Sequence, residues 1–371
     1  MKIAVMVKNF TLSGGAERYA VEVTRRLKNR GHDIDLYSRF TDASAADGMT
    51  LVPVPNRHTY RSVTSSLAYA RDAARLLEGK HYDIIHSHER GYSQDVLTVH
   101  TFCYRSGFVN EQSFTKRILK YHLSPRSLMY LWLEKKQMAS PRLAAVSDVI
   151  RRDIQACYGR TEGVRVITPG VDFDWFSPES IAGLRPRHKP DAPPGGLMVL
   201  FVGSEFRRKG LDALIPAIGE KIKLIVVGRG EYLKHYRELV AEYGVENRVE
   251  FTGHITDDVR RYYAAADVVV LPSLREAFGM TVLEGMACGL PVVVSPVAGA
   301  AGVVRDGKNG LLAGTVDELK TAFEYLRDDR VRREMGEEAR KTAESCSWDR
   351  ITDDYEDLFT DLLSSRGKHR Q

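Results

Sequence analysis

Residues 271–295 read LPSLREAFGMTVLEGMACGLPVVVS. They begin at the end of an apolar run, residues 267–271, that is typical of a buried parallel strand. A polar loop comes next, then a predicted helix that starts at about Phe278, and a second apolar strand covers residues 292–294. This order of strand, loop, helix and strand predicts a parallel α/β sheet with its ligand at the carboxyl ends of the strands.

The start of this predicted helix is an expected anion site. The N–H groups of Phe278, Gly279 and Met280 favour a negatively charged ligand, because they have no intrahelical acceptor and the helix dipole adds to them. Gly279 lets a phosphate approach the backbone. Two carboxylates, Glu276 and Glu284, flank the site, and hydroxyls of a sugar or ribose would explain them. The alternative is a solvated loop glutamate and a helix glutamate that interacts with the dipole.

The segment EAFGMTVLE, from Glu276 to Glu284, resembles the E-x7-E motif of the retaining glycosyltransferases of family 4, which have the GT-B fold. The resemblance implies an α/β protein with two Rossmann-like parallel-sheet domains facing a cleft. Residues 1–170 would form the acceptor domain and residues 171–347 the nucleotide-sugar donor domain, with a C-terminal helix over residues 348–365 returning to the first. Glu276 would then hold hydroxyls of the donor sugar, and Glu284 the ribose.

The composition is that of a globular protein with two cores. The chain has 371 residues, 43% hydrophobic and 28% charged, which excludes a disordered or fibrous protein. No run approaches the roughly 20 apolar residues of a membrane span, and the first residues read as a strand rather than a signal peptide, so we expect a cytoplasmic protein. The four cysteines are far apart in the sequence, and we expect free thiols: Cys103, Cys157, Cys288 and Cys346.

A glycine pair follows the first predicted strand. Gly14 and Gly15 lie between the apolar residues 2–7 and a helix predicted over residues 18–29, which is a ligand-binding position in an open parallel sheet. A lone Gly-Gly pair is most often a tight turn. The segment GGAER, however, resembles the glycine loop of the family, whose backbone approaches the donor diphosphate.

Histidines end two predicted strands in the same half of the chain. His100 follows the strand at residues 96–99, where catalytic groups of parallel sheets collect. By resemblance it lies beside the transferred sugar. His86 and His88 form an H-x-H pair with too few further ligands for a metal, so we predict no metal site.

A basic loop, GSEFRRKG, follows the strand predicted at residues 197–202, and phosphate is the partner that three consecutive cations favour. The family places the lysine of an R-K-G segment on the diphosphate, which corresponds to Lys209. Ser204 stands where many members have an arginine, so the second phosphate cation is either Arg207 or Arg208. The expected catalytic residues are His100, Glu276 and Lys209. The expected donor contacts are Gly14, Gly15, Ser204, Arg207, Arg208, Lys209, Gly228, Ile255, Phe278, Gly279, Met280 and Glu284.

Between residues 102 and 160 the sequence is basic and aromatic, with few acids. Such a segment suits an anionic membrane surface, into whose headgroup region aromatic side chains insert. It also suits nucleic acid. The third interpretation is a solvated helical face over core aromatics.

The resemblance implies a retaining hexosyltransferase, and the cations and helix start at the expected diphosphate site predict that it needs no metal or other cofactor. We expect it to move glucose from UDP-glucose to a hydroxyl of a lipid-linked glycan, at the inner face of the cytoplasmic membrane. The segment VGSEFRRKG looks closest to family members that glucosylate the heptose region of lipopolysaccharide inner core. The expected partners are the nucleotide sugar, the acceptor and an anionic membrane, without nucleic acid. The alternative, a protein that binds nucleic acid or lipid and has a regulatory nucleotide cleft, does not explain why the candidate residues all lie at strand ends.

Overall fold

The computed structural model describes residues 1–56, 62–109, 124–184, 195–253, 255 and 258–368. The chain divides into two compact units. Unit 1 consists of Met1–Pro169 and Trp348–Gln371, and unit 2 of Gly170–Ser347. The division lies one residue from the expected boundary between residues 170 and 171. The two ends of unit 2 lie side by side, since the Val171 N–H donates to the Cys346 carbonyl at 2.9 Å.

Unit 1 contains a seven-stranded sheet in the order β5-β3-β1-β6-β7-β8-β9, and all its pairings are parallel. The strands are β1 (Lys2–Met6), β3 (Asp33–Ser38), β5 (Thr50–Pro53), β6 (Ile84–Ser87), β7 (Val96–Val99), β8 (Arg142–Ala145) and β9 (Val164–Val166). A separate short parallel pair joins β2 (Asn9–Phe10) to β4 (Phe40–Thr41). The predicted parallel sheet of this half is therefore confirmed.

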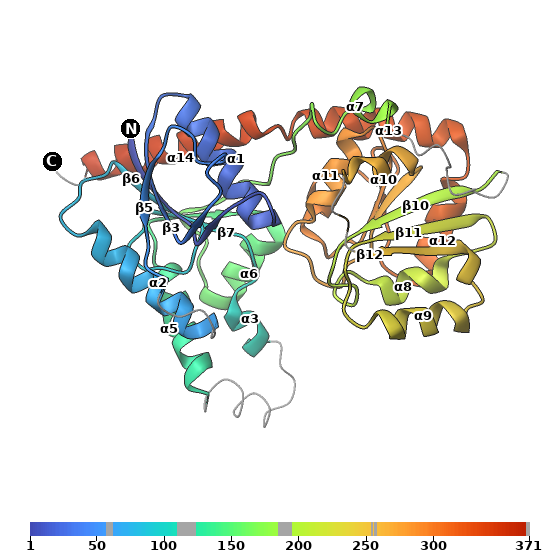
Figure 1. Cartoon of the computed structure of the whole chain (residues 1–371), viewed down its shortest axis with the longest axis horizontal. Coiled ribbons are helices and arrows are strands. Elements are labelled where there is room, and N and C mark those ends of the chain that lie inside the picture. The colour runs from blue at the N-terminus through green and yellow to red at the C-terminus, as the bar shows by residue number, and fades with distance from the viewer. Residues whose placement is uncertain (57–61, 110–123, 185–194, 254, 256–257, 369–371) are drawn as a thin grey trace. The chain divides into compact units, whose positions relative to one another are not determined.

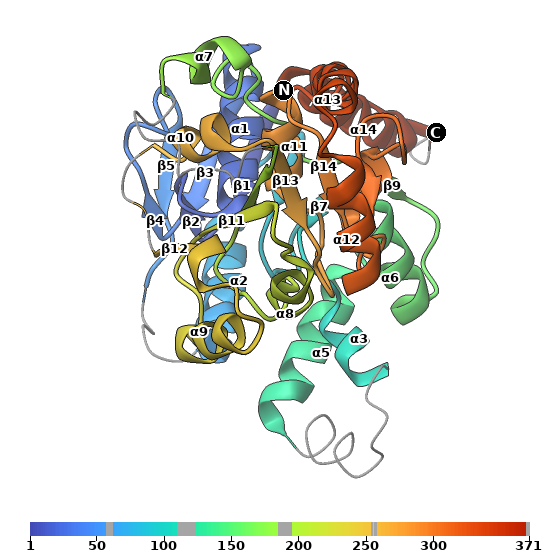
Figure 2. The same ribbon diagram turned by 90° about the vertical axis from the view of Figure 1, so that its right-hand side faces the viewer.

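The helices of unit 1 cover both faces of the sheet (Figure 1, Figure 2). The connection from β1 to β3 crosses the sheet in one direction, and the connections that leave β5, β7 and β8 cross it in the opposite direction. Because such connections are right-handed, the helix of the first lies on one face of the sheet and the helices of the others lie on the opposite face. Helix α1 lies beside α14 on one face. The helices are α1 (Gly15–Asn29), α2 (Ser62–Leu77), α3 (Tyr104–Val109), α5 (Pro125–Gln137), α6 (Asp148–Tyr158) and α14 (Trp348–Lys368).

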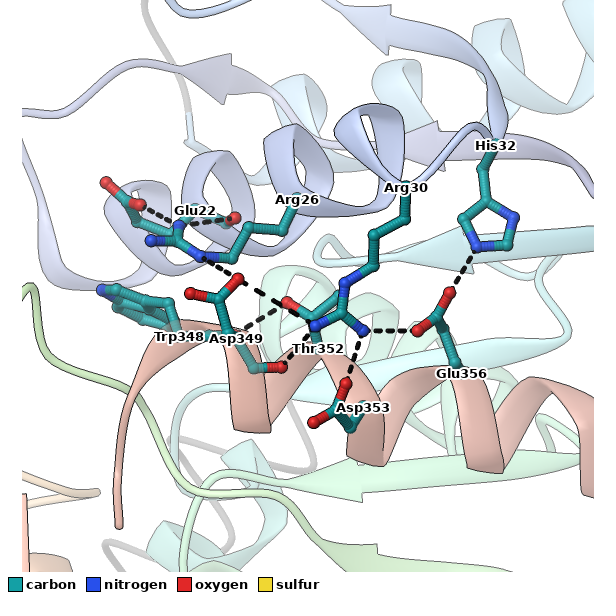
Figure 3. A network of polar contacts seen from close by, with 9 residues as sticks. All are labelled: Glu22, Arg26, Arg30, His32, Trp348, Asp349, Thr352, Asp353 and Glu356. Carbon is teal, nitrogen blue, oxygen red and sulfur yellow. Dashed lines mark hydrogen bonds and ion pairs between the residues drawn. The ribbon is translucent and has the colours of Figure 1, made fainter. Parts of the chain in front are cut away.

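Helix α14 is held to α1 by a row of ion pairs (Figure 3). Arg30 contacts Asp353 at 2.6 Å and also Glu356. His32 contacts the other oxygen of Glu356 at 2.7 Å. Burial favours a raised pKa for Glu356, but the hydrogen bonds from His32 and Arg30 hold that pKa below its ordinary value. The helix predicted over residues 348–365 continues to Lys368.

Buried aromatic residues of α14 complete the core of unit 1. Trp348 and Tyr355 are 1% and 0% exposed. The Tyr355 hydroxyl is hydrogen-bonded to the Tyr19 hydroxyl at 2.9 Å and to Thr98 Oγ1 at 2.7 Å. The C-terminal helix is thus part of the unit that also contains the N-terminal strands.

Unit 2 contains a six-stranded parallel sheet in the order β12-β11-β10-β13-β14-β15. Its strands are β10 (Leu197–Val202), β11 (Ile222–Val227), β12 (Val249–Gly253), β13 (Val268–Leu271), β14 (Val292–Val294) and β15 (Leu311–Leu312). Its helices are α7 (Pro178–Ala182), α8 (Leu211–Leu214), α9 (Leu233–Glu242), α10 (Arg260–Ala265), α11 (Met280–Ala287), α12 (Val316–Tyr325) and α13 (Asp329–Glu344), with short 3-10 turns η2 (Ile215–Ala217), η3 (Glu246–Arg248) and η4 (Gly299–Val303).

Two hydrophobic cores lie on the two faces of this sheet. Successive side chains of a strand point to opposite faces, and β10 accordingly places Leu200 in one core and Phe201 in the other. The first core includes the buried residues of α10 and α11, and the second those of α12. Two α/β units with parallel sheets are the fold predicted from the sequence.

Several element boundaries differ from the prediction. The first helix begins at Gly15 rather than at residue 18, so Gly14 is its N-cap. Helix α11 begins at Met280 rather than at about Phe278, with Gly279 as N-cap. Helix α6 begins after Ser147, which caps it, because the Ser147 hydroxyl accepts from the Ile150 N–H. None of the helices in the described part of the chain is both long and apolar enough to span a bilayer.

Candidate active site

The carboxyl ends of β10 and β13 bring two cations and one carboxylate together in unit 2. Glu276 Oε2 lies 3.1 Å from Arg208 Nη1 and 3.5 Å from Lys209 Nζ. The side chains of Glu276 and Lys209 are 12% and 14% exposed, whereas that of Arg208 is 37% exposed. Arg208 also contacts Glu205 at 2.5 Å and donates to the Arg275 carbonyl at 2.8 Å. The cluster therefore combines cationic hydrogen-bond donors for an anion with a carboxylate that can accept from hydroxyl groups.

Glycines at the strand ends make room for Lys209. A Cβ on Gly203 would lie 2.3 Å from Lys209 Cδ, so the glycine leaves room for the lysine side chain across the end of β10. A Cβ on Gly228 would lie 2.1 Å from the Gly203 carbonyl oxygen, and Gly228 has a φ of +136°. Close approach of the backbone after β11 to the backbone after β10 thus requires glycine at residue 228.

The start of α11 presents polar groups beside this cluster. Gly279 has a φ of +103°, and a Cβ there would lie 2.3 Å from Leu271 Cδ2. The Glu276 and Phe278 carbonyls accept from Gly299 and Ala300, which fixes the loop before the helix. The first N–H groups of a helix have no intrahelical acceptor, so an anion is favoured at this end of the sheet.

Two buried hydroxyls of the same region have no hydrogen-bond partner among the described residues, Ser273 Oγ in the loop after β13 and Thr281 Oγ1 in the first turn of α11. Buried polar groups normally have partners, and an oxyanion of a ligand would supply one here. The sequence prediction missed both residues. The serine and threonine side chains within LPSLREAFGMT were the only signal available, and such side chains are common in loops and helix caps.

Glu284 lies inside α11 with its carboxylate held by a tyrosine. It is 9% exposed, and its Oε2 accepts a hydrogen bond of 2.6 Å from the hydroxyl of Tyr263 on α10. Tyr263 is fully buried and packs edge-on against Phe176, with 5.5 Å between ring centroids. The sequence contained no signal for this pair, because the contact joins two helices that are 14 residues apart.

Unit 1 has a pocket of about 230 Å³ at the carboxyl ends of β6 and β7. His100 and His88 both line it, and His88 Nδ1 lies 3.0 Å from His100 Nε2 with the rings stacked at 5.2 Å. Glu89, Arg90 and Glu134 add charged groups to the wall. The H-x-H histidine His88 was not predicted as a site residue, although it lies beside the predicted His100.

The histidines around this pocket are neutral at ordinary pH. Burial lowers the pKa of His100 to about 4. Burial, and then the charge of His100, lower the pKa of His86 to about 3. The pKa of His88 is also lowered, chiefly by burial and then by the two other histidines. His86 Nε2 is hydrogen-bonded to Thr98 Oγ1 at 2.8 Å, so a buried polar chain links it through Thr98 to Tyr355.

The other predicted donor residues divide between the two units. Gly14 and Gly15 lie at the start of α1 in unit 1. Arg207 is exposed and lines a different pocket, with Asp212 and Tyr236, so Arg208 is the arginine that joins Lys209. Ser204 is exposed in the same loop, and Ile255 is partly buried against the core.

Two α/β units with parallel sheets make up the GT-B fold, which the solved structures named below share. The family model described as "Glycosyl transferases group 1" matches residues 185–342, and that described as "Glycosyltransferase Family 4" matches residues 13–175. The chain belongs to this family of glycosyltransferases, so it is a nucleotide-sugar-dependent glycosyltransferase.

Relatives and solved structures cover nearly the whole chain. A D-inositol 3-phosphate glycosyltransferase of Salinispora tropica is 30% identical, over 95% of this chain and 82% of that protein. The enzyme of the same name from Acidothermus cellulolyticus is 28% identical over 95% and 87%. The structure of WaaG, a glycosyltransferase involved in lipopolysaccharide biosynthesis, has a TM-score of 0.78 at 22% identity, covering 96% of this chain and 99% of that one. Anabaena HepE in complex with UDP and glucose has a TM-score of 0.73 at 22% identity, covering 97% and 100%.

Proposed function

We propose that the protein transfers glucose from UDP-glucose, with retention and without a metal ion, to a hydroxyl of a lipid-linked glycan such as the lipopolysaccharide core. The observation that carries the proposal is the contact of Glu276 with both Lys209 and Arg208. A donor diphosphate would meet the two cations while the sugar hydroxyls meet the carboxylate. The HepE complex with UDP and glucose supports this choice of donor.

The mechanism follows from the charges of this cluster. Negative charge grows on the diphosphate as the glycosidic bond breaks, and Lys209, Arg208 and the start of α11 stabilise it. This is the role that Mg²⁺ has in other phosphate chemistry. The leaving phosphate itself accepts the proton of the acceptor hydroxyl, so neither glutamate attacks the sugar. Glu284, held by Tyr263, binds the ribose.

The pocket with His88 and His100 is the proposed acceptor site. Arg90 is the one lysine or arginine among the described residues that line it, and Glu89 and Glu134 lie in the same wall. Because both histidines are neutral, the pocket favours hydroxyl groups over a phosphate. A second candidate acceptor is inositol phosphate, which the names of the two relatives favour.

A transfer assay tests donor and acceptor together. Purified protein is incubated with each of several UDP-sugars, GDP-sugars and ADP-sugars, and with either a truncated lipopolysaccharide core or D-inositol 3-phosphate, in the presence of a chelator. The expected result is transfer from UDP-glucose to the core with retained anomeric configuration. Transfer to inositol phosphate would replace the proposed acceptor. A requirement for Mg²⁺ or Mn²⁺ would contradict the metal-free mechanism.

We also propose that helix α5 brings the enzyme to an anionic membrane. Leu128 and Trp132 are each 48% exposed, and Tyr92, which packs edge-on against Trp132, is 38% exposed. Lys135 and Lys136 lie exposed near the C-terminal end of the same helix. Tyr130 of the same helix is buried instead and serves the core. Lys116, Arg117 and Lys120, three cations of the basic and aromatic sequence between residues 102 and 160, lie outside the described residues.

Sedimentation with vesicles tests the membrane proposal. Trp132→Ala with Lys135→Ala and Lys136→Ala is expected to reduce binding to anionic vesicles at low salt, while donor hydrolysis is unchanged. The matched control is Tyr325→Ala, an exposed aromatic of α12 in unit 2. If the unmodified protein ignores anionic vesicles but binds DNA, the nucleic-acid alternative is favoured.

A further inference from the structure

Two of the four cysteines, which are far apart in the sequence, lie side by side in unit 1. Cys103 precedes α3, and Cys157 lies in the last turn of α6. Both are buried, and their thiols are hydrogen-bonded. Asp153 lies one turn before Cys157 on the same face of α6. The two sulfur atoms and one carboxylate oxygen of Asp153 all lie within 4.8 Å of one another.

We propose that Cys103, Asp153 and Cys157 bind a thiophilic divalent cation, Zn²⁺ in particular. In a tetrahedral zinc site with bonds of about 2.0 to 2.3 Å, ligand atoms are about 3.5 to 3.8 Å apart. The two sulfur atoms and the Asp153 oxygen lie within 4.8 Å of one another, so small rotations of the three side chains would bring them to these distances. Three protein ligands leave a fourth position for water.

The charge balance of the cluster also favours a cation. Asp153 has no ion-pair partner among the described residues, and its Oδ2 accepts a hydrogen bond of 2.7 Å from the Cys103 N–H. That bond orients the carboxylate toward the thiols, in the way that outer hydrogen bonds orient metal ligands. Zn²⁺ bound to two thiolates and one carboxylate would neutralise most of the charge that the three ligands carry.

Neighbouring residues hold the cluster in place before any metal binds. Glu134 of α5 accepts a hydrogen bond of 2.9 Å from the Arg105 N–H at the start of α3 and one of 2.6 Å from the Tyr158 hydroxyl at the end of α6. The carboxylate therefore ties together the two segments that carry the cysteines. Cys103 also lines the pocket that contains His100. A bound cation would thus fix the wall of the proposed acceptor pocket of unit 1.

The test is a metal titration of the full chain, reduced and stripped by a chelator, with Cd²⁺ and Zn²⁺ as probes. The expected result is one equivalent of Cd²⁺ bound with a thiolate charge-transfer absorption, displaceable by Zn²⁺. Cys103→Ser or Cys157→Ser should remove the absorption and weaken binding by at least about 100-fold, since first ligands matter at least as much as the outer shell. The matched control is the double variant Cys288→Ser with Cys346→Ser, two buried cysteines of unit 2, which should bind as the wild type does.

Asp153→Asn keeps a side-chain oxygen that can accept from the Cys103 N–H. It provides a second test of the site if the serine variants fail to fold. It should weaken Zn²⁺ binding by about 10 to 100-fold while the circular dichroism spectrum stays unchanged. The proposal is overturned if the reduced wild type gives no charge-transfer absorption, or if the Cys288 and Cys346 control loses it instead. It is also overturned if reduced protein binds no metal and air oxidation yields a Cys103–Cys157 disulfide.

Discussion

Replacing Tyr263 by Phe removes one hydroxyl and leaves the ring that packs against Phe176. The hydroxyl donates to Glu284 at 2.6 Å, and both residues are buried. A hydrogen bond to a charged group contributes about 1.5 to 3 kcal/mol. For a unit of this size, 1 kcal/mol shifts the Tm by about 2 to 4 °C. We therefore expect the Tm of unit 2 to fall by about 3 to 12 °C.

The same substitution should weaken nucleoside diphosphate binding. Without the tyrosine hydroxyl, the Glu284 side chain must be ordered by the ligand, at a cost of about 1 to 2 kcal/mol. We expect the Kd of UDP, measured by calorimetry, to rise by about 5 to 30-fold. The kcat at saturating donor should change little, because the ribose contact is the same in the ground state and the transition state.

Tyr236→Phe is the matched control for this experiment. Tyr236 is also buried in unit 2, and its hydroxyl donates to Asp212 at 3.0 Å, but it belongs to the core on the other face of the sheet. It should lower the Tm without changing UDP binding. Equal losses of UDP affinity in the two variants, or none in Tyr263→Phe when Glu284→Gln weakens binding, would refute the reasoning.

Three further outcomes are expected. Lys209→Ala should lower kcat by about 100-fold or more while the donor Kd rises less, because the charge on the diphosphate grows in the transition state. Single-turnover kinetics and a binding isotherm measure the two effects. A raised KM with unchanged kcat would contradict this expectation. Glu276→Gln should also lower kcat by about 100-fold, yet leave UDP Kd equal or lower, because the removed charge lies 3.1 and 3.5 Å from the cations that meet the phosphates. Weaker UDP binding in calorimetry would mean that Glu276 contacts the nucleotide. The folded pKa of His100 is about 4, below the unfolded value of about 6.5, so its contribution to stability is present above pH 6.5 and is lost as the pH falls toward 4. Thermal melts from pH 7.5 to 4.5 should show a shallower decline for His100→Gln than for the wild type or for a variant of the exposed His235; identical slopes would argue against a neutral His100.

Local signals in the sequence predicted local structure well. Helix α6 carries such signals at both ends, a Ser147 cap and a left-handed Gly159. The apolar runs of β7, β10 and β14 likewise match the predicted strands. The start of α11 was placed two residues early, because nothing in AFGM distinguishes an extended residue from a helical one until Gly279 adopts its positive φ.

Contacts between distant segments were beyond the sequence. The choice between Arg207 and Arg208 depended on which side chain turns toward Glu276, 68 residues away in the chain. The Tyr263 contact with Glu284 and the meeting of Cys103 with Cys157 depend in the same way on how helices pack. The spacing of Glu276 and Glu284 suggested the kind of site, but the partners of each carboxylate required the fold.

Unit 2 is inserted into the sequence of unit 1. The hydrogen bond from the Val171 N–H to the Cys346 carbonyl holds the two ends of unit 2 side by side. Unit 1 cannot close its core during synthesis until α14 has been made, because Trp348 and Tyr355 fill that core. The ribosome produces the whole of unit 2 before those residues, and domains fold as units when their chain is complete. Unit 2 should therefore reach its native state first. Until α14 is made, the N-terminal strands keep an exposed apolar face, which chaperones can bind.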